Sequence, residues 1–91
     1  MRMLDAAKAT VALAVERGYA EIRSDEDNMQ SLSYNHIIEM LSKMETTPMS
    51  DAKMGRWLGW LQAACVYGTG GAVSLDDCKR INMEHADDHH D

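Results

Sequence analysis

The chain has no phenylalanine, one proline and two cysteines among its 91 residues. With no Phe and few other aromatics, its core must rely on aliphatic side chains and on eight methionines, which pack adaptably. Cys65 and Cys78 lack the paired spacing of a disulfide framework or a zinc site, so we expect reduced, buried thiols. No apolar run approaches the roughly 20 residues of a membrane span. The run 9–15 lacks signal-peptide flanks, so we expect a cytoplasmic protein.

Basic residues are also few, with nine Lys and Arg against fifteen Asp and Glu, for a net charge of −6. This balance argues against a general binder of phosphate backbones and against direct nucleic-acid binding. One acidic cluster consists of Glu21, Asp25, Glu26 and Asp27. A second lies in residues 84–91 among three histidines, where we expect a disordered tail after a single helical domain spanning 1–83.

Apolar residues recur at helical spacing in four segments, which predicts an all-α fold, a compact bundle of about four helices. The expected helices are 3–17, 32–45, 51–67, and 74 to 82 or 84. The third is apolar around most of its circumference, so we expect it to be central and to form a short hairpin with the fourth. The connection 19–30 is polar and acidic, which is typical of a surface loop.

Capping residues support these boundaries. Gly18 is placed to end the first helix, and either Ser31 or Ser33 to begin the second. Ser50 is the expected N-cap of the third, flanked by a hydrophobic staple of methionines. Ser74 and Asp77 have the spacing of a capping box for the fourth, whose inward residues we expect to be Leu75, Cys78 and Ile81.

Gly55 and Gly59 lie inside the third helix, although each glycine costs about 1 kcal/mol relative to alanine there. Close approach of another helix would offset that cost. We favour packing against the first helix, which offers Ala7 and Ala14; the alternative is a dimer in which this helix meets its own copy.

Lys53, Arg56, Trp60 and Tyr67 share one sector of the same helix and form the best candidate site. Arg56 and Trp60 have the i,i+4 spacing of a cation–π contact. If exposed, such a patch could anchor a protein interface or stack on bases. We favour the other interpretation, in which Trp60 and Tyr67 are edges of the core and the cations extend around them, because a small domain needs its few aromatics inside.

No pattern of catalytic residues emerges, so we expect no enzyme and no cofactor. The glycine-rich run 68–71 follows a helix and lacks the lysine of a phosphate-binding loop, so we interpret it as a turn. Cys65, Cys78, His85 and His89 could ligate a metal, but their spacing does not match that of a zinc site, and we expect none.

The run Arg56-Trp57-Leu58-Gly59-Trp60-Leu61-Gln62, followed by Gly71, Ser74, Asp77 and Asn82, resembles small proteins of unknown function encoded by bacteriophages and prophages. The resemblance covers roughly residues 36–82. It implies a phage-type accessory protein in the host cytoplasm, with no catalytic residues to transfer.

Together with the acidity, the resemblance suggests non-catalytic binding of a host protein or complex, as in anti-CRISPR or anti-restriction proteins. The partner-binding residues would be the acidic cluster and the helix sector, namely Glu21, Asp25, Glu26, Asp27, Lys53, Arg56, Trp60 and Tyr67. One alternative is nucleic-acid binding or regulation through Lys53, Arg56, Lys79 and Arg80, which the net charge disfavours. Another is a homo-oligomeric structural module.

Overall fold

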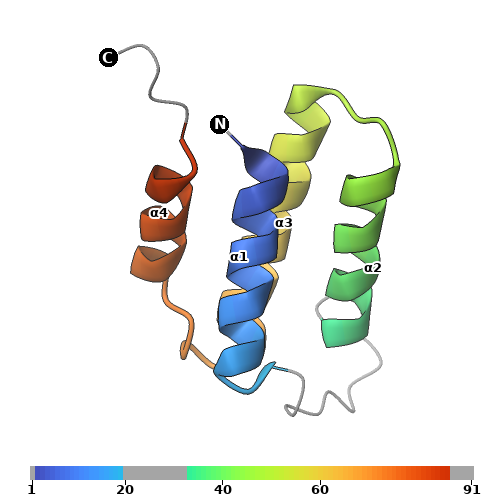
Figure 1. Ribbon diagram of the computed structural model, residues 1–91. Coiled ribbons are helices and arrows are strands. Elements are labelled where there is room, and N and C mark those ends of the chain that lie inside the picture. Colours follow the sequence, from blue (N-terminus) through green and yellow to red (C-terminus); the bar gives the residue numbers. More distant parts are fainter. Residues whose placement is uncertain (1, 20–32, 87–91) are drawn as a thin grey trace.

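The computed structural model describes residues 2–19 and 33–86, which form four α-helices. They are α1 (Met3–Glu16), α2 (Tyr34–Thr46), α3 (Asp51–Gly68) and α4 (Leu75–Glu84). Successive helices run in opposite directions, so α1 and α3 are parallel, and these two pack against each other (Figure 1). The expected all-α bundle of four helices is confirmed.

The helix that packs against each of the other three is α1. Figure 1 shows α2 and α4 on opposite flanks of α1, with α3 behind it. The expectation of a tight hairpin between the last two helices needs correction, because α4 packs mainly on α1. As a result, α4 makes few contacts with α3.

Three serines begin three of the helices. The side chains of Ser33, Ser50 and Ser74 each accept a hydrogen bond from the backbone N–H three residues further on. The side-chain carboxylate of Asp77 accepts a hydrogen bond from the backbone N–H of Ser74, which completes the expected capping box of α4. Gly18 follows the end of α1 with φ of +96°, the left-handed conformation that favours glycine at such a site. These caps confirm the expected helix ends to within one or two residues.

The core is mostly aliphatic, as the composition implies. Most apolar residues that recur at helical spacing are buried or half-buried. Leu75, which was expected to face inward, is 67% exposed. Val73, one residue before the N-cap of α4, is fully buried, so Leu75 at the first helical position is turned outward. The buried apolar residues are Ala6, Ala7, Val11, Ala14, Tyr19, Ile37, Met40, Met44, Leu58, Leu61, Ala64, Cys65, Val73, Cys78 and Ile81.

Tyr19 belongs to this core, although its segment was expected to be a polar connection. Its side chain is only 2% exposed, and its ring meets that of Tyr34 edge-on with centroids 5.5 Å apart. Burial raises the pKa of its hydroxyl well above the usual range. The ring also lies against Gly68 at the end of α3, so the first residue after α1's cap joins three helices at one end of the bundle.

A small polar network crosses the core. The buried Gln62 side chain of α3 donates to the hydroxyl of Thr10 on α1, at 3.1 Å, and to Oδ1 of Asn82 on α4, at 2.8 Å. Asn82 Nδ2 donates back to Gln62 Oε1 at 3.2 Å. Thr10 itself donates to the carbonyl of Ala6. In the described part of the chain, no buried side-chain nitrogen or oxygen lacks a hydrogen-bond partner.

Arg17, just after α1, holds the connection between α3 and α4. Its guanidinium donates to the carbonyl of Ala72 and pairs with Asp77 at 2.9 Å. The pKa of Asp77 falls from its ordinary 3.8 to about 2. The main cause is the hydrogen bond from the Ser74 backbone N–H, and the Ser74 hydroxyl and the charge of Arg17 add to it, while burial opposes the shift. The ionised carboxylate therefore fastens the start of α4 to the end of α1.

This arrangement predicts an acid-dependent part of the stability. Because the folded pKa of Asp77 lies below the unfolded value, the contribution of its carboxylate is complete above about pH 4 and disappears as the pH falls toward 2. Urea unfolding of the wild type and of Asp77→Asn between pH 5 and pH 2 should show a difference that shrinks over this interval. Asp76→Asn leaves the Ser74 and Arg17 contacts in place and is the matched control. A difference for Asp77→Asn that stays constant down to pH 2 would contradict this account.

The last turn of α4 extends further than the expected domain boundary at residue 83. Glu84 is helical, and the backbone N–H of His85 bonds to Ile81 and Asn82. The guanidinium of Arg2 donates a hydrogen bond to the backbone carbonyl of Glu84, and its backbone N–H donates one to the carbonyl of His85. These two bonds connect the start of α1 to the end of α4. The ordered domain thus includes part of the segment that was predicted to be a disordered tail.

Candidate functional site

One face of α3 remains uncovered by the other helices. We call it the outer face of α3; it consists of Ala52, Lys53, Arg56, Gly59, Trp60, Ala63 and Tyr67, all of them exposed. Trp60 is 47% exposed and Tyr67 59% exposed, so the preferred expectation that they form edges of the core is wrong. The physical reason is that α3 packs mainly on α1 and α2, so the sector that faces away from both helices stays open.

The two glycines of α3 do not mediate close helix packing as expected. A Cβ added at Gly55 would make an ordinary contact of 3.6 Å with the sulfur of Met3, and one added at Gly59 would meet nothing within 4 Å. Gly59 lies on the outer face of α3, where a larger side chain would fit. The packing of the fold therefore does not require glycine at this position.

A groove of about 390 Å³ lies between α2 and α3, and we call it the α2–α3 groove. It borders the outer face of α3, because Trp60 belongs to both. Trp57, also in the wall, is half-buried, and Met40 is buried. The residues that line the groove are His36, Glu39, Met40, Lys43, Trp57 and Trp60.

The α2 side of this groove was missed from the sequence. No role was predicted from the sequence for His36, Glu39 or Lys43. The three polar residues and Met40 have the spacing i, i+3, i+4 and i+7, which aligns them along one side of a helix. This spacing is a signal that sequence reasoning could have found, but only the structure shows that it faces two tryptophans.

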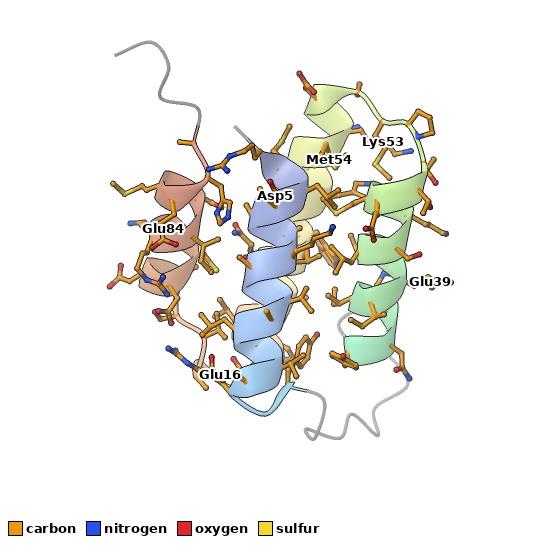
Figure 2. All side chains as sticks on the ribbon, viewed as in Figure 1. Asp5, Glu16, Glu39, Lys53, Met54 and Glu84 are labelled. Atoms are coloured by element: carbon orange, nitrogen blue, oxygen red, sulfur yellow. The ribbon has the colours of Figure 1, made fainter. Side chains whose placement is uncertain are left out.

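Lys53 makes a cation–π contact in this region, with Trp57, which was not predicted from the sequence. Lys53 Nζ lies 5.5 Å from the centre of the Trp57 ring, at i,i+4 spacing. Figure 2 shows Lys53 near the connection between α2 and α3. Arg56 is exposed one turn before Trp60 on the outer face of α3.

The cations at and beside the groove have no carboxylate partner in the described part of the chain. Lys43, Lys53 and Arg56 make no ion pair within residues 2–19 and 33–86. Three other cations are paired: Lys8 with Glu45, and Arg17 and Arg80 with Asp77. Lys43 lines the groove together with the carboxylate of Glu39, and Lys53 and Arg56 are exposed beside its tryptophan wall on α3. These cations stand out on a protein whose net charge is −6.

Other candidate residues do not join this site. Lys79 and Arg80, proposed with Lys53 and Arg56 as a basic surface, lie on α4, which is on the opposite flank of α1 from α2 (Figure 1). Arg80 is paired with both Asp77 and Glu84. The acidic cluster in 21–27 lies outside the described residues, so its role in partner binding stays a prediction.

The two cysteines are buried and unbonded, as expected. Burial, with a smaller effect of Cys78, raises the pKa of the Cys65 thiol to about 12; burial and Asp77 also raise that of Cys78. Thiols held protonated in this way are poor nucleophiles and poor metal ligands. Within the described residues, no three His, Cys, Asp or Glu side chains gather where they could hold a metal ion, and His89 lies outside them.

Comparison with known proteins yields no match to a family model, to a curated protein or to a solved structure. Of the helices in the described part of the chain, none has the length and apolar character needed to cross a membrane.

Proposed function

We propose that this protein acts by non-catalytic binding of another protein, through the α2–α3 groove and the adjoining outer face of α3. The observation that carries the proposal is the exposure of Trp60 and Tyr67 beside Arg56. Trp, Tyr and Arg are the residues enriched at the energetic centres of protein interfaces. A groove that borders them supplies the concave pocket into which a partner's side chain can insert.

The resemblance to bacteriophage proteins extends the proposal to the partner's origin. We propose a host protein or complex in the cytoplasm as the target, with antagonism of host defence or nucleic-acid machinery as the outcome. The acidic residues Glu21, Asp25, Glu26 and Asp27 would then contact a basic surface of that target, which suits the net charge of −6.

Trp60→Ala is expected to weaken partner binding about tenfold or more, because truncating a central aromatic anchor removes a large buried contact. The measurement is capture of partners from nuclease-treated host lysate on the immobilised protein, followed by titration of the recovered partner. Leu75→Ala is the matched control, since Leu75 is equally apolar and 67% exposed but lies on α4. An equal loss of partner affinity with both variants, or no loss of affinity with Trp60→Ala, would contradict the proposed binding surface.

Nucleic-acid binding is the second candidate, favoured by the exposure of Trp60 and Tyr67 next to Lys53 and Arg56. Aromatic side chains beside cations are what single-strand binders use to stack bases and hold phosphates. The net charge of −6 opposes it, since every phosphate beyond the local cations is repelled. A gel shift at low salt decides between the two: binding that Trp60→Ala abolishes would favour this candidate.

A further inference from the structure

The charges around the α2–α3 groove indicate what its occupant carries. We propose that the groove binds a segment of a partner protein in which a bulky apolar side chain is flanked by Asp or Glu residues. The apolar side chain enters between Trp57 and Trp60, and the carboxylates pair with Lys43, Lys53 and Arg56. This inference rests on the proposed protein-binding function and specifies the chemistry of the partner.

The size and walls of the groove fit a side chain. Its volume of about 390 Å³ is near the lower end of the range for ligand pockets, which is about 300–1,000 Å³. Two indole rings and the thioether of Met40 make its apolar surface, and methionine adapts its shape to an inserted group. These walls favour an aliphatic or aromatic anchor over a purely polar ligand.

The helix directions concentrate the cations at one end of the groove. Because α2 and α3 are antiparallel, the last turn of α2 with Lys43 adjoins the first turns of α3 with Lys53 and Arg56 (Figure 1). Figure 2 shows Lys53 near the α2–α3 connection and Glu39 farther from it along α2. An occupant therefore meets three cations at that end, and its acidic residues are expected there.

The same charges favour a short acidic segment over a nucleic acid. Lys43, Lys53 and Arg56 can satisfy a few carboxylates, whereas the surrounding protein has a strongly negative balance. A nucleic acid brings a phosphate at every step of its backbone, and most of these would lie beyond the three cations. A protein segment can confine its charge to the places where the cations lie.

The two tryptophans of the groove are the only ones in the chain, so selectively excited tryptophan fluorescence reports on this site alone. The probe is a tryptophan-free, capped peptide, Glu-Glu-Leu-Phe-Asp-Glu, compared with Gln-Gln-Leu-Phe-Asn-Gln and Glu-Glu-Ala-Ala-Asp-Glu. We expect a saturable fluorescence change with the first peptide, and affinities about tenfold lower with each of the other two. Binding of the first peptide, followed by this fluorescence change, should weaken with added salt.

The matched variants are Lys43→Gln/Lys53→Gln/Arg56→Gln, which removes the groove's cations, and Lys79→Gln, which removes an exposed cation of α4. The triple variant should bind the acidic peptide about tenfold more weakly, and Lys79→Gln should bind it like the wild type. No saturable change up to millimolar peptide, equal affinity for the amide peptide, or tighter binding of a thymidine oligonucleotide would each overturn the inference.

Partner capture separates this inference from the proposed function. If Trp60→Ala abolishes capture but the triple variant does not, the groove region binds a protein whose contact does not depend on carboxylates, and only the inference fails. If neither variant affects capture, the proposed function fails with it. Loss of capture with both variants, but not with Lys79→Gln, supports both.

Discussion

Gly68→Ala is expected to lower the free energy of unfolding by about 2 kcal/mol, although alanine is the better helix former. A Cβ at this position would overlap Cε1 of Tyr19 and lie 2.9 Å from Cζ and 3.0 Å from Cδ1. The Tyr19 ring is 2% exposed and held edge-on by Tyr34, so it has little room to shift. Overpacking of this kind costs up to about 3 kcal/mol, offset by the roughly 1 kcal/mol gained when alanine replaces glycine in a helix.

Gly59→Ala is the matched control, because it makes the same change in the same helix where nothing lies within 4 Å of the new Cβ. It should stabilise the protein by about 0.5–1 kcal/mol. Urea unfolding at neutral pH measures both variants. In a Tyr19→Ala background, Gly68→Ala should lose its penalty and behave like Gly59→Ala. Destabilisation by Gly68→Ala that persists in that background would show that the ring is not its cause.

The helices could be predicted because their signals are local. Ser33, Ser50 and Ser74 each lie directly before an apolar periodic segment, and a cap acts on backbone groups within three residues of itself. The spacing of the apolar residues predicted the four helices, and Ala7 and Ala14 of the first are buried. Such features depend only on residues close in the sequence, so they can be predicted without knowing how the helices pack.

The predictions that were wrong concern contacts between segments far apart in the sequence. Whether Trp60 is covered depends on how the other helices pack around α3. The place of α4 depends in part on the Arg17 contacts with Ala72 and Asp77. Tyr19 follows a helix cap and precedes an acidic stretch, so nothing local reveals the space that Gly68 leaves for its ring. These outcomes depend on residues about 50 positions apart in the sequence, which periodicity cannot relate.

Only the part of the candidate site that lies on α3 could be predicted, because its residues belong to a single helix. Lys53, Arg56, Trp60 and Tyr67 share one helix, so their common sector follows from helical geometry and the structure confirms it. The residues of α2 that complete the groove belong to another helix, and their pairing with α3 is a tertiary contact. Exposure of the sector, which gives it functional interest, is likewise a property of the whole bundle.

Gln62→Leu is expected to lower the free energy of unfolding by about 2 kcal/mol, although leucine has a similar volume and is more apolar. The substitution removes the donor that serves both Thr10 and Asn82, as well as the acceptor that the Asn82 amide uses. Thr10 keeps its bond to the carbonyl of Ala6, so the unsatisfied group is the half-buried Asn82 side chain. Leaving such a group without a partner costs about 1–3 kcal/mol.

A double-mutant cycle with Asn82→Leu tests this account. Each single variant should destabilise, whereas Gln62→Leu/Asn82→Leu should be less destabilised than the sum of the two by about 1–2 kcal/mol, because no amide is then left unpaired. The amide pair connects α3 to α4, whose main packing is on α1, so a strong coupling would also show that the pair helps to position α4. Additive effects in the cycle would mean that the two amides act independently and that their pairing does not help to position α4.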